Sequence, residues 1–194
     1  MLAEIPADRT TAGAAFEYGN VNYVLLGLVI EEVTGRRVVE VLRDGVLGID
    51  GVERLIYQPD EIPTEPIAIE NGQSTDVLEA VGGFLPSFAL TSDGPAAAMA
   101  SNSVSLGRWW RAFCAGEIVS EASLTEMTTI NDGYGLGLYE TDPPGTVGHG
   151  GEDAGYRSLA GCLPQYGVVF AVLANRSVDI SAVAGPLVDA LRSP

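Results

Sequence analysis

The sequence has no lysine, a single histidine and only two cysteines in 194 residues. All ten basic residues are arginine, and a guanidinium group does not accept a proton near neutral pH. Lysine chemistry is therefore absent from this chain, whatever its fold. One histidine excludes a zinc site made of several histidines of this chain, and we expect neither a bound metal nor a cofactor.

Positive charge is scarce as well, since 26 acidic residues stand against 10 basic ones and the net charge is −16. Nucleic acids and anionic membranes are bound by Lys and Arg that neutralise phosphate, so we expect neither partner. No apolar run is long enough to span a bilayer. Residues 1–15 lack the basic and apolar regions of a signal peptide, which leaves the compartment open with the cytoplasm favoured.

The two cysteines, Cys114 and Cys162, lie far apart in the sequence. Their spacing permits a disulfide but does not require one. We expect two buried thiols that behave as small apolar side chains.

Apolar periodicity predicts helices at residues 21–34, 37–47, 103–115, 121–128 and 179–192. Asn20 is the expected N-cap of the first helix, and its nearly continuous apolar sequence predicts that this helix is largely buried. Residues 50–95 are rich in Pro, Gly, Asp and Glu. They predict a long loop of the kind that frames a binding site.

The last third of the chain predicts four consecutive strands, at residues 134–139, 145–150, 156–163 and 167–174. The fourth is apolar on both faces, as a central strand covered on both sides would be. The order of elements predicts an α+β fold in which helices pack on an antiparallel sheet. Residues 1–130 form the mainly helical region with the long loop, and residues 131–194 form the strands and the C-terminal helix.

Two short motifs carry groups suited to chemistry. Tyr18 and Asn20 stand two residues apart at the start of the first helix, where the phenol and the amide can face one cavity. His149 lies between glycines in Gly148–Gly151, which let a ligand approach the backbone closely, and peptide N–H groups beyond it can face an oxyanion. Each motif also has a plain structural reading, as a packed tyrosine with a helix cap and as a glycine-rich strand end.

Taken together and in order, these segments resemble the serine hydrolases of the β-lactamase and penicillin-binding-protein family, which include class C β-lactamases, esterases and D-amino-acid peptidases. The Tyr-x-Asn region of that family is similar to FEYGNVNYVLLGLVIEEVTGRRVVEVL. Its following helix pair resembles ASNSVSLGRWWRAFCAGEIVSEASLTEM, and its Tyr-Gly-Leu-Gly strand resembles YGLGL. The His-x-Gly form of its Lys-Thr-Gly motif resembles GHGGEDAGYRS.

The resemblance implies an active site between a helical region and an antiparallel sheet, with acyl transfer from an amide, lactam or ester to a serine. It implies that Tyr18 moves protons, that Asn20 holds the substrate, and that His149 polarises the tyrosine. Gly150 and Gly151 would line the bound substrate, and the Glu152 N–H would donate to the oxyanion. Gly19 stands where the family commonly has serine.

The Ser-x-x-Lys motif of the family is absent, because the chain contains no lysine. A phenol has a pKa of about 10, so a base poised near 7 needs a downward shift of roughly 3 units, or about 4 kcal/mol from nearby cations. A histidine that is mostly neutral at pH 7 replaces the missing lysine poorly. We therefore expect a hydrolase fragment that is inactive alone, or a catalytically dead ligand-binding module of the same fold.

The resemblance also implies strands that precede this sequence and pair beside the segment 167–174. An uncovered edge recruits partners, so we expect a homodimer or a second chain over it. The alternative is that Met1 is not the natural start of the protein.

Overall fold

The structure is a computed structural model that describes residues 11, 13–58, 60–64, 68, 94–97, 99–153 and 155–192. Most of the predicted loop at residues 50–95 lies outside these residues. Its described part contains β1 (Ile56–Tyr57), which pairs with β2 (Met99–Ala100) in a two-stranded antiparallel sheet.

The main sheet is antiparallel and has four strands among the described residues, in the order β3-β4-β5-β6. They are β3 (Tyr139–Thr141), β4 (Thr146–Asp153), β5 (Tyr156–Leu163) and β6 (Val168–Ala174). A short 3-10 helix, η3 (Pro164–Tyr166), connects β5 to β6 and ends at Gly167, whose φ of 63° suits glycine. The α+β class and the antiparallel sheet predicted from the sequence are confirmed.

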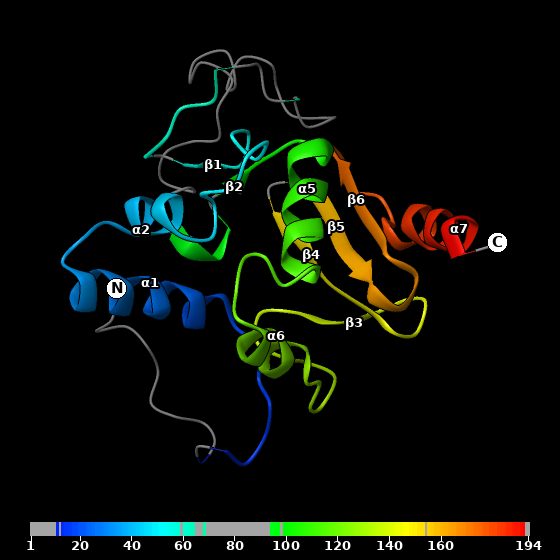
Figure 1. The fold of residues 1–194 in the computed structure, drawn as a ribbon, viewed down its shortest axis with the longest axis horizontal. Helices are drawn as coiled ribbons and strands as arrows, with labels where there is room; N and C mark the ends of the chain where they lie inside the picture. The colour runs from blue at the N-terminus through cyan, green and yellow to red at the C-terminus, as the bar shows by residue number, and fades with distance from the viewer. Residues whose placement is uncertain are drawn as a thin grey trace.

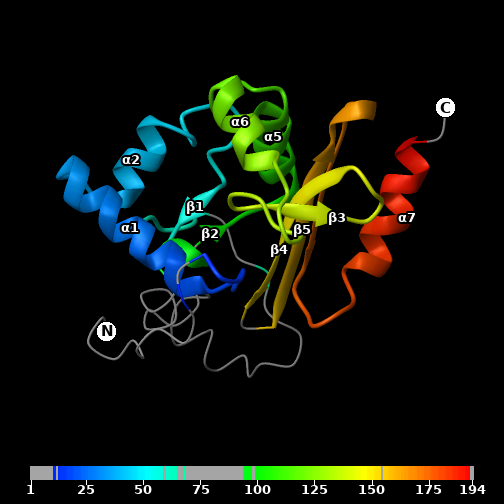
Figure 2. The ribbon, with the colours of Figure 1, turned by 90° about the horizontal axis from the view of Figure 1, so that it is seen from below.

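Helices cover both faces of this sheet (Figures 1 and 2). On one face lie α5 (Ser103–Cys114) and α6 (Glu121–Thr128); on the other lies α7 (Ser181–Arg192). Each face has its own core. Trp110, Phe113, Leu138 and Ala160 pack on the α5 side, and Leu159, Leu163, Phe170, Ala184 and Val188 pack on the α7 side.

The helices α5 and α6 match the sequence predictions closely. Asn102 caps α5 by accepting a hydrogen bond from the Ser105 N–H, and Ser120 caps α6 by accepting one from the Ser123 N–H. Such caps satisfy backbone donors that the first helical turn leaves unpaired. This local chemistry fixes both starts without tertiary contacts.

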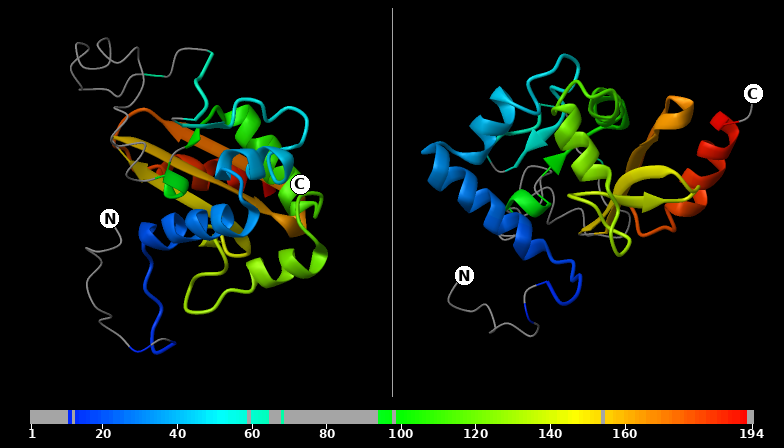
Figure 3. Two further views of the ribbon diagram at one scale, coloured as in Figure 1. Left: turned by 90° about the vertical axis from the view of Figure 1, so that its left-hand side faces the viewer. Right: turned by 60° about the horizontal axis from the view of Figure 1, so that its bottom comes forward.

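The other two helices, α1 (Asn20–Thr34) and α2 (Val38–Asp44), lie side by side away from α7 (Figure 3). A small cluster of Val38, Val39 and Tyr57 ties α2 to β1. Gly27 of α1 packs on the ring of Pro95 in the 3-10 helix η2 (Gly94–Ala96) so closely that a Cβ there would lie 2.3 Å from Pro95 Cγ. This contact explains a glycine in a helix interior.

Two predictions about α1 are wrong. Asn20 is the first helical residue, and the N-cap is Gly19, which makes no side-chain cap bond; the Asn20 side chain instead accepts a hydrogen bond from Tyr18. The helix is also not largely buried, because Gly27 is its only buried residue among those described. Its exposed apolar side chains are Val21, Leu25, Leu26, Leu28, Val29 and Val33.

Two predictions about the strands need correction as well. Residues 134–138 are not a strand: Tyr134 forms isolated bridges to Asn131 and Tyr139, and the strand begins only at Tyr139. The apolar strand β6 is covered by α5 and α7 on its two faces, as predicted. It is however the edge strand of the described sheet, not a central one.

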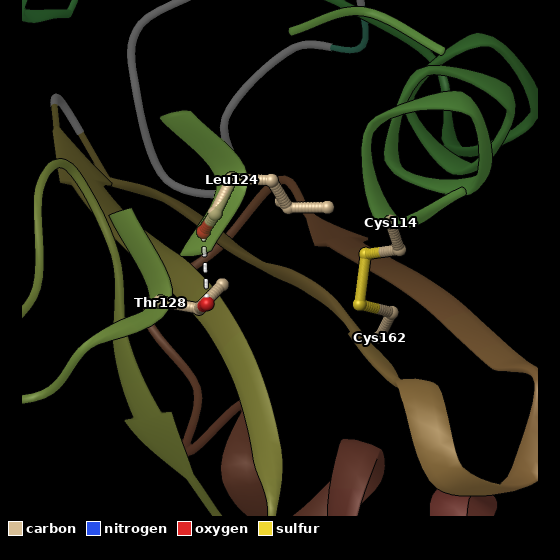
Figure 4. The surroundings of a disulfide bond; sticks show 4 residues. All are labelled: Cys114, Leu124, Thr128 and Cys162. Carbon is tan, nitrogen blue, oxygen red and sulfur yellow. Dashed lines mark hydrogen bonds between the residues drawn. A yellow bond between two sulfur atoms is a disulfide. The ribbon is translucent and has the colours of Figure 1, made fainter. Parts of the chain in front are cut away.

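The expectation of two free thiols is also wrong, since Cys114 and Cys162 form a disulfide (Figure 4). Their Cα atoms are 6.6 Å apart, within the span of a disulfide. The bond joins the last residue of α5 to a buried residue near the end of β5, an inner strand of the described sheet. The separation of the two cysteines along the sequence did not indicate that they are close in space, because they come together only when α5 packs on the sheet.

Candidate active site

His149 of β4 lies on the face of the sheet against which α5 packs. In the ladder His149 lies opposite Ala160 of β5, which is followed by Ala171 of β6. Alternation along the strand puts Val147, His149 and Gly151 on this face. The sheet therefore holds the imidazole at the boundary between the main core and the segment that leads into α1.

Tyr18 and Asn20 approach this imidazole from the other end of the chain. The Tyr18 phenol donates a hydrogen bond of 3.3 Å to Asn20 Oδ1, and the Tyr18 ring centroid lies 6.1 Å from that of His149. The three residues that the sequence placed in two separate motifs thus meet at one place. Tyr18 is 47% exposed there, so the site opens to solvent.

Two further tyrosines, Tyr134 and Tyr139, contact the His149 ring, and a third, Tyr23, contacts Tyr134; none of the three was predicted from the sequence as a site residue. Tyr134 makes a 2.7 Å hydrogen bond to His149 Nε2 and a 2.8 Å hydrogen bond to the Tyr23 phenol. The ring of Tyr139 lies 5.2 Å from the imidazole. Tyr23 had one sequence signal: it stands three residues after Asn20, which places both on one side of a helix.

A tight turn sets the position of Tyr134. Asn131 and Tyr134 exchange two backbone hydrogen bonds of 3.0 Å across Asp132 and Gly133, whose φ angles are 51° and 83°. Positive φ at both central residues is the pattern of a type I′ turn, for which Asp-Gly is favoured. The next residue, Gly135, admits no side chain, because a Cβ would lie 2.1 Å from the Met127 carbonyl oxygen.

Space beside Gly150 and Gly151 is limited by the ends of two neighbouring side chains. A Cβ on Gly150 would lie 2.7 Å from the Tyr139 hydroxyl, and one on Gly151 would lie 2.5 Å from Ser158 Oγ. Glu152 forms an ion pair with Arg157, the residue opposite it in β5. These contacts give Gly150, Gly151 and Glu152 local structural roles that are independent of any ligand.

One edge of β4 is open beside the site. The strand β3 pairs with β4 only at Thr146, Val147 and Gly148. In the described part of the chain no strand pairs with that edge from His149 onward. Backbone groups on an open edge are available to an extended ligand.

The electrostatics of the site favour neutral groups. Burial lowers the pKa of His149, against a smaller opposite effect of its hydrogen bond to Gly150. Burial, then Tyr23 and Tyr139, raise the pKa of Tyr18 above its ordinary value. Burial and the Tyr23 hydrogen bond raise the pKa of Tyr134 further. No described cation lowers the pKa of Tyr18, so the phenol stays protonated near neutral pH.

Other features of the described residues lie apart from this site. A surface hollow of about 350 Å³ lies along α2, and its charged side chains pair with one another, as in the Arg36–Asp44 and Arg43–Glu61 ion pairs. Within the described ranges no three His, Cys, Asp or Glu side chains gather as metal ligands. None of the described helices has both the length and the hydrophobicity needed to cross a membrane.

Comparison with known proteins identifies the family. The family model named Beta-lactamase matches residues 1–190, and the chain therefore belongs to the β-lactamase family. The resemblance drawn from the motifs is confirmed.

Solved structures agree on the fold. D-amino acid amidase from Ochrobactrum anthropi SV3 is 20% identical with a TM-score of 0.75, over 91% of this chain and 58% of the amidase. A D-stereospecific amidohydrolase from Streptomyces sp. is 30% identical with a TM-score of 0.62, over 86% of this chain and 52% of that protein. The octameric penicillin-binding protein homologue from Pyrococcus abyssi is 25% identical with a TM-score of 0.68, over 90% of this chain and 43% of that homologue. The chain thus spans about half the length of these proteins.

Proposed function

We propose that this chain supplies one part of an acyl-transfer active site that cleaves an amide, a lactam or an ester. The observation that carries the proposal is the meeting of Tyr18, Asn20 and His149 beside an open strand edge. The amide-cleaving activity named for the amidase and the amidohydrolase of similar fold favours an amide substrate.

In this site Tyr18 transfers protons between a serine nucleophile and the leaving group, and Asn20 holds the phenol and the substrate. His149 contributes a neutral imidazole against the Tyr18 ring. The substrate lies along the open edge of β4, where Gly150 and Gly151 leave room, and the Glu152 N–H donates to the oxyanion.

The serine and its lysine partner must come from polypeptide outside this sequence. In this chain burial raises the Tyr18 pKa. A tyrosine that acts as a base near neutral pH needs its pKa lowered by roughly 3 units. A lysine ammonium beside the phenol would act in that direction. The chain alone is therefore inactive as an acyl-enzyme.

Covalent labelling tests this proposal. The chain alone, treated with fluorescent penicillin or a fluorophosphonate, is expected to form no stoichiometric adduct, and an adduct would contradict the proposal. A longer polypeptide with an in-frame Ser-x-x-Lys before Met1 is expected to label. Tyr18→Phe is expected to slow that labelling by at least about a hundredfold. Tyr166→Phe, which removes a phenol outside the site, is the matched control.

A ligand-binding module of the same fold is the second candidate. The absence of lysine and the raised Tyr18 pKa favour it. The coding sequence upstream of Met1 discriminates the two candidates: an in-frame Ser-x-x-Lys supports the enzyme. If that motif is missing, a D-amino-acid amide that binds the chain without being cleaved supports the module.

We also propose that a second copy or a separate chain covers the apolar surfaces left open here. These are the edge of β6, with which no described strand pairs beyond β5, and the exposed face of α1. Open edges and large apolar patches recruit partners. The octameric homologue shows that assembly occurs in a protein of similar fold. Light scattering is expected to show association; a monomer that binds no hydrophobic dye would contradict the idea.

A further inference from the structure

We propose that Tyr134 is the positioning residue of His149: with the Gly150 carbonyl it occupies both ring nitrogens and holds the imidazole in one tautomer and one orientation against Tyr18. A role for Tyr134 in catalysis rests on the proposed function. The hydrogen bonds that position His149 are made between described residues and do not depend on that function.

The partners of the His149 ring determine which atom donates and which accepts in each of its hydrogen bonds. His149 Nδ1 lies 2.6 Å from the Gly150 carbonyl oxygen, which can only accept, so Nδ1 carries the proton. In the neutral ring Nε2 is then an acceptor, and the Tyr134 hydroxyl donates to it at 2.7 Å. The Tyr134 oxygen in turn accepts from the Tyr23 hydroxyl at 2.8 Å.

This chain of donors favours the neutral imidazole. A protonated ring would present a second N–H at Nε2, so the Tyr134 oxygen would have to accept from it, and the Tyr134 hydroxyl would have to donate to Tyr23 instead of accepting from it. Among the described residues three tyrosines contact the ring: Tyr18 before α1, Tyr134 on its turn and Tyr139 on β3. Tyr23 on α1 contacts Tyr134 behind it. Burial acts in the same direction as these donors, because it also lowers the His149 pKa.

The assignment changes how His149 takes part in the reaction. Both of its nitrogens are engaged, so the ring does not take the Tyr18 proton directly. The imidazole contacts Tyr18 through the two rings, whose centroids are 6.1 Å apart. Tyr134 also lies beside Tyr18, at 5.6 Å between ring centroids. Tyr134 therefore contacts both the imidazole and Tyr18, the residue to which the proposed function assigns proton transfer.

The single histidine makes the test direct, since the imidazole signals in an NMR spectrum of the chain need no assignment. In the unmodified chain the nitrogen shifts are expected to report the Nδ1–H tautomer at neutral pH. Tyr134→Phe removes the donor to Nε2 and is expected to raise the His149 pKa by roughly half a unit to one unit. Tyr139 contacts the imidazole by its ring and not by a hydrogen bond, so Tyr139→Phe is expected to leave the His149 pKa unchanged.

Three outcomes would overturn the assignment: the Nε2–H tautomer in the unmodified chain, an unchanged or lowered pKa in Tyr134→Phe, or an equal shift in Tyr139→Phe. The tautomer measurement needs no variant, so it decides the matter even if Tyr134→Phe does not fold. None of these readouts involves turnover. Failure of the labelling experiment would therefore leave the Tyr134 assignment intact, and the reverse also holds.

Discussion

Removal of the Cys114–Cys162 disulfide gives the clearest quantitative prediction. The bond closes a segment with a sequence separation of 48 residues. Loop-closure entropy for that length corresponds to about 4 kcal/mol of stability at 25 °C. For a chain of this size, that loss corresponds to a fall in Tm of roughly 8–16 °C. The double variant Cys114→Ala/Cys162→Ala is chosen because Cys162 is only 1% exposed, and a buried serine hydroxyl would add a cost of its own.

Urea unfolding of four samples measures the effect: the unmodified chain and the double variant, each with and without dithiothreitol. Reductant is expected to lower the free energy of unfolding of the unmodified chain to about that of the variant, and to leave the variant unchanged. A variant within 1 kcal/mol of the oxidised chain would refute the entropic reasoning. Two titratable thiols in the unreduced, unfolded chain would refute the disulfide itself. Because disulfides persist mainly in oxidising compartments, a confirmed bond would weigh against the cytoplasm.

Three further predictions follow from close contacts and from the site. Gly27→Ala drives a methyl group into Pro95 and is expected to lower the free energy of unfolding by about 1–3 kcal/mol, measured by urea unfolding. Gly135→Ala meets the Met127 backbone, which cannot rotate away, so it should cost more than Gly27→Ala; an equal or smaller loss would count against the turn geometry. The folded chain prefers neutral His149, so its contribution to stability is complete above the unfolded pKa of about 6.5 and is lost as pH falls through the lower folded value. The urea midpoints of the unmodified chain and of His149→Gln, compared from pH 7.5 to 5, should converge toward acid; a constant difference would contradict the pKa direction.

Local sequence signals predicted most of the secondary structure. Apolar periodicity predicted α5 and α6, and in the structure both begin at side-chain caps that act within one turn, Asn102 and Ser120. Turn residues at both ends mark β5, and a continuous apolar, valine-rich run marks β6. The error at residues 134–138 has a local cause too: Asp132 and Gly133 make a turn so tight that Tyr134 pairs across it instead of extending a strand.

The family, the α+β class and the residues of the two motifs could be predicted from the sequence, because they depend on residue type and spacing along the chain. Which distant residues contact one another depends on how the elements pack. That packing joined Cys114 to Cys162, and it brought Tyr134 to His149 and Tyr23 to Tyr134. It also left the apolar side of α1 exposed. Hydrophobicity shows that a side chain tends to be buried, but whether it is buried depends on what packs against it in the folded molecule.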